Sequence, residues 1–368
     1  MPNIDPFDAI SNMTRSAMDD VLNKRVLSQH NSAYMVMMGH AYTQHGRDLQ
    51  TNLLVGEHAG RWTRSGQTAW DRSIRNVFAS GRIEWARFIK SMNVDGFDYE
   101  RQVGKKLHTA FDSGSFSVGK ARTLVSLHLE EAMGTRDEMT RDINNAIHFS
   151  GTQPSGGEGF LGFDKLTAAE ESWAGNAPDA FGKHKWNSAL LNKKPYINAP
   201  LTRDMEGNPF SLFGEFEDLM IDLNHGGSQA TPLGVDVEYQ AFIAQRIFSD
   251  ILKSPHMRGV LRRSTTGEPA NAEISGIKAT EPLRWDAYNL TIYPDSMAPN
   301  TRVVVINKEC VRLAQISDDQ TFTEPWRLGA DADTALVPFS KSIQLWADDR
   351  SQSGALYNIG SHDGSYVA

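Results

Sequence analysis

The clearest pattern along the chain is a stripe of apolar positions between about residues 118 and 149. These positions recur every three to four residues, the spacing that gathers side chains on one face of an α-helix. The stripe consists of Ala121, Leu124, Val125, Ala132, Met139, Ile143, Ala146 and Ile147. We predict a spine helix over about 118–149, roughly 45 Å long at about 1.5 Å per residue. A helix over 99–112 is expected before it.

A weaker helical period covers residues 7 to about 38, behind the helix-start signal Asp5-Pro6. Glycine, serine, threonine, arginine and aromatic residues then dominate residues 51–90, where glycines interrupt apolar and β-branched stretches. This texture predicts a long β-hairpin excursion. We interpret residues 1–50 as an N-terminal arm and residues 51–90 as an extended loop.

The second half of the chain mixes both periodicities. Apolar spacing predicts helices near 209–223 and 236–252, separated by the helix stop Asn224-His225-Gly226-Gly227. Short β-rich segments near 284–293, 302–312 and 341–348 predict strands, whereas residues 165–205 predict no element. The expected class is therefore α+β.

Composition bounds the class of protein. The 368 residues are 40% hydrophobic and 22% charged, which is typical of a globular chain that buries a sizeable core. The longest apolar run, Ala33 to Met38, is far shorter than the roughly 18 residues that cross a bilayer, so no membrane partner is expected. The first thirty residues lack the order of a secretion signal. The single cysteine, Cys310, forbids an intrachain disulfide and is expected to be a small buried hydrophobe.

Charge is unevenly distributed. The chain carries a formal net charge of −8, but residues 51–90 hold seven cations and three anions, which makes this segment +4 and the remainder −12. Three of the eight tryptophans, Trp62, Trp70 and Trp85, fall in the same segment. Because an isolated two-stranded hairpin is marginal in water, these aromatic side chains need a surface to pack against, and another subunit is one candidate.

Motifs for chemistry are weak. Residues Gly157 to Gly162 satisfy G-x-G-x-x-G, but a helix precedes the glycines where a dinucleotide site requires a strand. We interpret this loop as a hinge after the spine helix and expect no cofactor. The histidine spacings do not place two ligands on one helical face, and Ser361-His362-Asp363 cannot converge as a triad. No catalytic or metal-binding residue is predicted.

The layout resembles the major capsid proteins of tailed double-stranded DNA bacteriophages, the Hong Kong 97-like fold shared with encapsulins. The resemblance rests on the order arm, loop, spine helix and α+β region over nearly the whole chain. Its most specific stretches are Ile143 to Gly162, Asp295 to Asn307, and Ile343 to Gly354. It implies a peripheral domain over 91–205, an axial domain over 206–340, and a closing peripheral strand and C-terminal tail over 341–368.

The implied function is structural. Such a chain would self-assemble through hexamers and pentamers into an icosahedral shell around a phage genome, and would be located in the virion after assembly in the host cytoplasm. Separate scaffolding and portal proteins, cement proteins and non-specifically bound packaged DNA would be its partners. Two alternatives stay open: an encapsulin-type shell around protein cargo, and a nucleotide-dependent enzyme that uses Gly157 to Gly162.

Charge complementarity suggests the inter-subunit contacts. The basic, aromatic loop is expected to lie over an acidic face of a neighbouring subunit. On the loop the candidates are Arg61, Trp62, Arg64, Trp70, Arg72 and Arg75, and on the acidic face they are Glu215, Glu217, Asp218 and Asp222.

The resemblance also raises the question of covalent cross-linking, because some relatives join a loop lysine to a neighbour's asparagine. No lysine occurs between Lys24 and Lys90, and Lys90 falls at the base of the loop, where it would face its own subunit. Arginine stays protonated and is a poor nucleophile. We therefore expect a shell without covalent cross-links.

Overall fold

The computed structural model describes the elements of the body and leaves several segments undescribed. The described residues are 32–46, 48–54, 78–95, 118–151, 159–168, 173, 216–221, 223, 237–253, 262–263, 282–316, 327–328, 334–348 and 350–357. Most of the predicted first helix, the predicted helix at 99–112 and nearly all of 165–205 lie outside these ranges.

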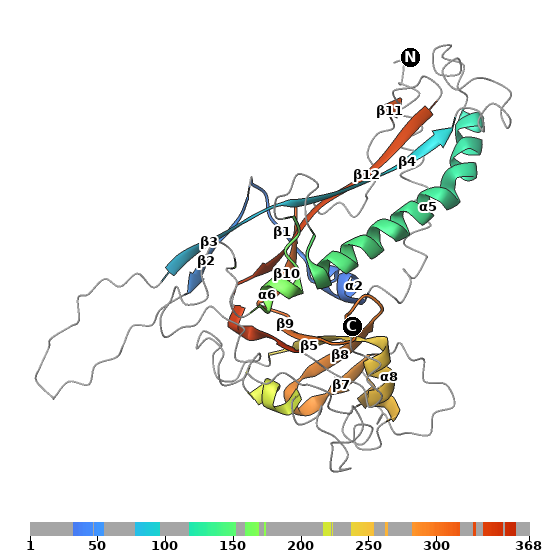
Figure 1. The fold of residues 1–368 in the computed structure, drawn as a ribbon. Coiled ribbons are helices and arrows are strands. Elements are labelled where there is room, and N and C mark those ends of the chain that lie inside the picture. Colours follow the sequence, from blue (N-terminus) through green and yellow to red (C-terminus); the bar gives the residue numbers. More distant parts are fainter. Residues whose placement is uncertain are drawn as a thin grey trace, which may run out of the picture.

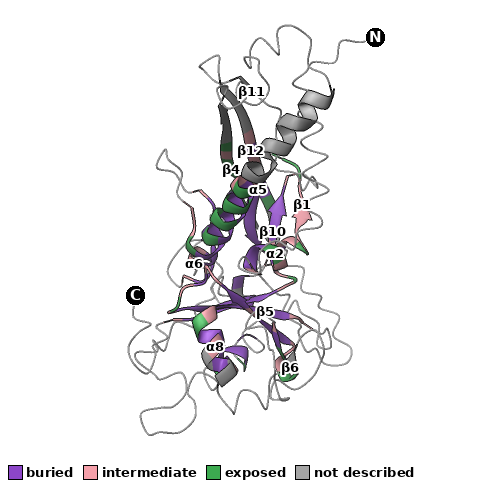
Figure 2. Ribbon diagram, turned by 90° about the vertical axis from the view of Figure 1, so that its right-hand side faces the viewer, coloured by how far each residue is buried: buried purple, intermediate pink, exposed green. Residues whose placement is uncertain are grey.

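The spine helix is present as predicted. Helix α5 runs from Val118 to Phe149 and passes along one side of the molecule (Figure 1). Along its final turns it is two-faced, since Met139, Ile143 and Ile147 are buried while the opposite face is exposed (Figure 2). The short helix α2, Ser32–Met38, packs beside it, and α6, Phe163–Leu166, follows it.

The upper sheet contains the longest strands. Its order is β1-β10-β12-β11, and β4 also pairs with β12. Strands β4 and β12 are antiparallel from Ala86↔Ile343 to Asp95↔Thr334 and lie beside α5 (Figure 1). The strand bounds are Tyr42–Thr43 (β1), Ala86–Asp95 (β4), Val311–Gln315 (β10), Arg327–Leu328 (β11) and Thr334–Ala347 (β12).

A two-stranded hairpin projects from this sheet. Strand β2, Asp48–Leu54, is antiparallel to β3, Phe78–Glu84, and both point away from the body (Figure 1). Only Trp85 separates β3 from β4, so one stretch of chain serves first the hairpin and then the upper sheet. The predicted hairpin is confirmed at its root, and residues 55–77 lie outside the described ranges.

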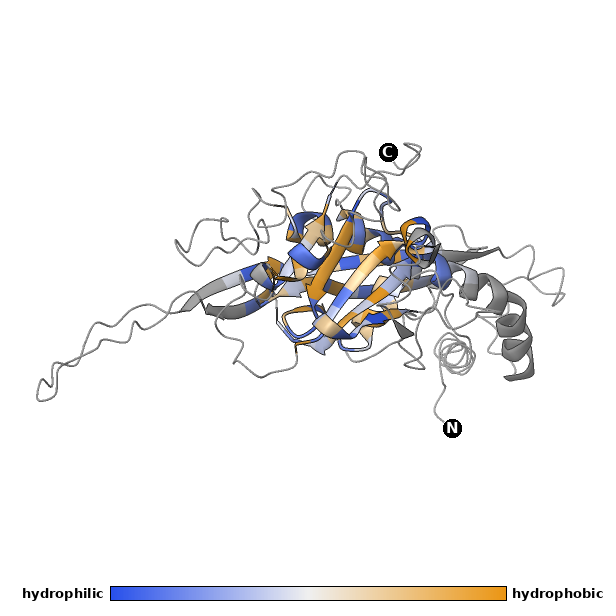
Figure 3. Ribbon diagram, turned by 90° about the horizontal axis from the view of Figure 1, so that it is seen from below, coloured by the Kyte–Doolittle hydropathy of each residue, from blue (hydrophilic) through white to orange (hydrophobic). Residues whose placement is uncertain are grey.

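The lower sheet has the order β13-β9-β5-β8-β7-β6. Helix α8, Gln245–Lys253, and helical residues 216–221 accompany it, and its strands are strongly hydrophobic when seen from below (Figure 3). The strand bounds are Tyr239–Ala244 (β5), Arg262–Arg263 (β6), Leu283–Trp285 (β7), Leu290–Asp295 (β8), Val303–Asn307 (β9) and Ser353–Leu356 (β13). Two 3-10 turns, Asp286–Tyr288 and Arg350–Gln352, complete it.

One element prediction was wrong. The segment expected as a helix over 236–252 is strand β5 followed by helix α8. All six residues of β5 are buried, because the strand lies inside the sheet between β8 and β9. A strand buried on both faces shows no alternation, and its apolar run cannot be distinguished by period from a helix.

The predicted strands are present with altered bounds. The segment 302–312 divides into β9 and β10, which belong to different sheets. Cys310 falls in the turn between them, where it is half-buried against the upper core instead of fully buried as expected. The closing strand β12 starts at Thr334, seven residues before the predicted start at 341.

Candidate functional site

The projecting hairpin is anchored by an apolar cross-strand pair at its root. Leu49 of β2 lies opposite Ile83 of β3, and both side chains are buried in the core that also contains Ala86 and Trp346. Burying two aliphatic side chains of this size contributes on the order of 3–6 kcal/mol relative to exposure. The hairpin therefore leaves the body from a packed base.

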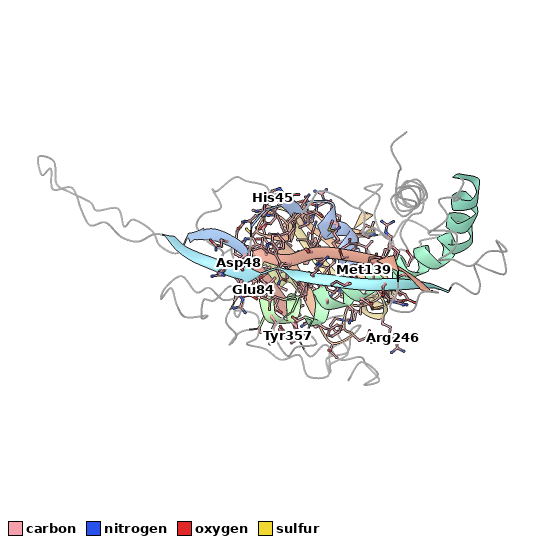
Figure 4. The ribbon with its side chains drawn as sticks, turned by 90° about the horizontal axis from the view of Figure 1, so that it is seen from above. His45, Asp48, Glu84, Met139, Arg246 and Tyr357 are labelled. Carbon is pink, nitrogen blue, oxygen red and sulfur yellow. The ribbon has the colours of Figure 1, made fainter. Side chains whose placement is uncertain are left out.

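Polar contacts surround the same root. The Arg82 guanidinium forms an ion pair with Asp48 at 2.5 Å, and Trp85 Nε1 donates to the carbonyl of Gly46 at 3.1 Å. Asp48 and Glu84 lie where the hairpin meets the body (Figure 4). Arg82 is 57% exposed, so its ion pair adds little free energy and mainly orients the side chains.

Lys90 faces its own subunit, as the sequence analysis expected. Its Nζ lies 2.6 Å from Glu138 and 3.4 Å from Asp142, one helical turn apart on α5. The hydrogen bond with Glu138 raises the pKa of Lys90 and, in the other direction, lowers the pKa of Glu138. The amine is thus held protonated beside α5, which makes it a poor nucleophile.

The predicted inter-subunit residues are mostly outside the described ranges. This applies to every loop candidate, Arg61, Trp62, Arg64, Trp70, Arg72 and Arg75, and to Glu215 and Asp222. Of the acidic candidates, Glu217 and Asp218 lie on the helical residues 216–221 beside the lower sheet. The Tyr288 hydroxyl donates to Glu217 Oε1 at 3.1 Å, and burial followed by this hydrogen bond raises the pKa of Tyr288. One Glu217 oxygen is therefore already used within the subunit.

The glycine loop packs against the end of the spine helix. A Cβ on Gly162 would lie 2.4 Å from the carbonyl oxygen of Ala146 and 2.7 Å from that of Ile147. Only glycine allows this approach, and the groups it meets are carbonyls at the negative end of the helix dipole. A phosphate binds at the opposite, N-terminal end. The described part of the loop thus favours the hinge interpretation over a nucleotide site, and Gly157 lies outside it.

A buried polar cluster that the sequence did not indicate joins three elements. Asp295 at the end of β8 is fully buried and accepts from the backbone N–H of Ala33 at 2.7 Å and from Asn144 Nδ2 at 2.9 Å. The His148 imidazole lies 3.7 Å away, and Arg302 donates to the His148 carbonyl. The cluster connects α2, α5 and the lower sheet. The only available signal was the turn residue Asp295 after Pro294.

Among the residues described, no group of three or more His, Cys, Asp or Glu side chains could hold a metal ion. Likewise, the described helices include none long and apolar enough to span a membrane.

Large apolar side chains remain exposed on the subunit. Ile89 on β4 is 65% exposed and Phe149 at the end of α5 is 46% exposed. Ile89 points to the face of β4 opposite Phe88 and Lys90, and Lys90 contacts α5. Single exposed apolar residues are ordinary on a protein surface, but these two lie on elements that extend beyond the compact lower sheet (Figure 1).

The architecture matches solved shell proteins. The structure titled "Cyanophage A-1(L) capsid asymmetric unit" superimposes with a TM-score of 0.60 at 14% identity, covering 90% of this chain and 93% of that chain. The structure titled "Mycobacterium phage Bobi" gives a TM-score of 0.50 at 11% identity, covering 88% and 90%. No protein-family model and no curated protein sequence matches the chain.

At these identities the likeness establishes the fold. The chain is an α+β protein with the Hong Kong 97-like capsid fold, and the resemblance inferred from the sequence is confirmed at that level. Nearly the full length of both chains is shared, so the match includes the projecting hairpin, the spine helix and both sheets. The boundaries assigned to peripheral and axial domains stay predictions.

Proposed function

We propose that this protein is a structural subunit that assembles into an icosahedral capsid around a phage double-stranded DNA genome. The observation that carries the proposal is the likeness to the cyanophage capsid chain over 90% of this sequence. That protein is known from a capsid, and the shared elements include those that have no use in a compact monomer. The proposed role is structural, with no catalytic residue or cofactor.

The geometry of the subunit supports self-association. A hairpin that extends beyond its own core leaves its backbone edges unpaired and available to a neighbour. Many weak contacts per subunit, each reversible alone, allow errors to dissociate before the shell closes. The expected loop contacts, Trp62 and Trp70 with the surrounding arginines, would lie on a second copy of the chain. Tryptophan burial would supply most of the affinity, while the charges set register.

The remaining partners follow from the same proposal. Separate scaffolding and portal proteins, with or without cement proteins, would act during assembly in the host cytoplasm, and packaged DNA would contact the inner face without sequence specificity. An encapsulin-type compartment is the alternative with the same fold, and the contents of the particle distinguish the two.

The test is to express the chain and measure particle size by light scattering and electron microscopy. We expect closed shells of megadalton mass, and particles isolated with their genome should contain DNA and carry a portal. Replacing Trp62 and Trp70 together by alanine should abolish shells and leave a folded monomer or capsomer, as checked by circular dichroism. A parent chain that stays monomeric under all assembly conditions contradicts the proposal. Shells filled with protein cargo favour the encapsulin alternative.

A further inference from the structure

Gln344 on β12 is a fully buried amide whose hydrogen-bonding groups are all engaged. Its Oε1 accepts from the backbone N–H of Leu161 at 3.0 Å and from that of Leu345 at 3.0 Å. Its Nε2 donates to the carbonyl of Glu84 at 3.0 Å and to that of Gly159 at 3.4 Å. One side chain therefore joins the hairpin, the loop after the spine helix and the upper sheet.

The contact with Glu84 lies where the chain changes partner. Glu84 is the last residue of β3 and pairs with Asp48 of the hairpin, whereas Ala86 begins β4 and pairs with Ile343 of the upper sheet. Trp85 between them belongs to neither ladder. Beyond Ile343, β12 continues beside β10 only. The Gln344 side chain thus bonds the hairpin strand at the point where backbone pairing with β12 has ended.

The other two contacts reach the end of α5. Gly159 and Leu161 belong to the loop that returns against the helix, where Gly151 N donates to the Phe160 carbonyl at 2.8 Å and Gly159 N donates to the Gly151 carbonyl at 2.9 Å. Gly162 then packs on the last carbonyls of the helix. The position of this loop is therefore tied to that of the spine helix.

We propose that Gln344 is a positioning residue for assembly, which sets the direction of the β2–β3 hairpin relative to the spine helix. This inference rests on the proposed shell function. A hairpin acts as a lever, so a small rotation at its root displaces its far end by a larger distance. Because every subunit repeats the same angle, an altered root would change the curvature of the shell.

The argument depends on the amide group, because both a donor and an acceptor are required. Methionine resembles glutamine in length and fills the same space without either group. Glutamate keeps the shape and the acceptor, but an ionised carboxylate cannot donate and would face the carbonyl oxygens of Glu84 and Gly159. Both substitutions should therefore release the hairpin root from the loop.

Gln352 provides a matched control. It is also a buried glutamine, 3% exposed, and its Oε1 accepts from the Tyr239 hydroxyl at 3.1 Å and from Asn307 Nδ2 at 3.4 Å. Those partners lie in the lower sheet and do not contact the hairpin. Gln352→Met should lower thermal stability in a similar way while leaving hairpin direction unchanged.

The experiment compares particles of the parent, Gln344→Met, Gln344→Glu and Gln352→Met by electron microscopy, with thermal unfolding of each subunit. We expect closed shells of parental diameter to fall about tenfold or more for both Gln344 variants, as the loss of a buried hydrogen bond implies. Open or differently sized particles should replace them, and Gln352→Met should give parental shells. Amide hydrogen exchange should be faster at Glu84 and Leu161 in the Gln344 variants.

Parental diameters from folded Gln344 variants would overturn the inference while leaving the shell function intact. If neither variant folds, unchanged exchange at the hairpin root in a partly destabilised Gln344→Asn subunit would overturn it equally. A parent chain that forms no shells would instead refute the proposed function.

Discussion

Gly162 shows how a single residue fixes the return of the chain onto the spine helix. Its missing side chain lets the loop approach three backbone atoms of α5 and its end, including Ser150 N at a distance of 2.8 Å from a Cβ placed on Gly162. Its own φ of −104° is ordinary for any residue. The requirement for glycine is therefore one of space and not of backbone strain.

Replacing this glycine should accordingly be costly. We expect Gly162→Ala to lower the free energy of unfolding by about 1–3 kcal/mol or more, because backbone atoms cannot yield as a flexible side chain can. Gly134→Ala on the exposed face of α5 is the matched control, since nothing lies within 4 Å of its added Cβ. That substitution should stabilise the protein by up to about 1 kcal/mol through helix propensity. Urea unfolding of both subunits measures the difference, and equal effects would contradict this account.

Among the elements, α2, α5 and β8 depend on one another through Asp295. The carboxylate receives the first backbone N–H groups of α2 and the Asn144 amide of α5, so three segments far apart in sequence share one buried charge. Burial alone would raise the pKa of Asp295, but the His148 imidazole and the N–H groups of Ala33 and Met297 outweigh it and hold the pKa below its ordinary value of 3.8. The carboxylate therefore stabilises the fold in its ionised form.

This arrangement predicts a pH dependence of stability. The contribution of Asp295 should be fully present above about pH 4, the unfolded-state value, and be lost as the pH falls through the lower folded-state pKa. Asp295→Asn should cost about 1–3 kcal/mol at neutral pH, because the new amide would direct a donor at N–H groups. The difference between parent and variant should shrink in acid.

Thermal unfolding between pH 2 and pH 7 tests this expectation. Asp286→Asn is the control, since Asp286 is 49% exposed in its ion pair with Arg284 and should contribute little at any pH. A parent-to-variant difference for Asp295 that stays constant down to pH 2 would contradict the assignment.

For the whole molecule, the fold connects a compact lower body with two long projecting features, the β4–β12 pair and the hairpin (Figure 1). No amine suited to cross-linking occurs on the hairpin excursion, because the sequence has no lysine between Lys24 and Lys90. Lys90 itself is paired with Glu138 and Asp142 of its own subunit. Shell stability would then depend on non-covalent contacts.

Mature particles boiled in detergent should accordingly release a single band at the chain mass of 40.9 kDa. Lys90→Arg should leave both the band and the particle yield unchanged, since arginine keeps the ion pairs and removes the amine. Ladders of multimers that resist boiling in the parent and disappear in Lys90→Arg would show that the lysine does form cross-links.

The spine helix and the hairpin root could be predicted from the sequence because their signals are local. A three-to-four-residue apolar period sustained over about thirty residues leaves few alternatives to a helix, and α5 occupies the predicted range. The β-rich texture around residues 51–90 likewise indicated a hairpin whose root is present. Order along the chain was therefore accessible before any contact was known.

Strand β5 and the polar contacts of Gln344 and Asp295 required the tertiary structure. Tyr239–Ala244 becomes a strand because β8 and β9 lie on either side of it, and no local period records that position. Gln344 is 183 residues from Leu161, and Asp295 is 262 residues from Ala33. A buried polar side chain acquires its role from partners that only folding brings within hydrogen-bonding distance, so the same residue types read along the chain carry no such information.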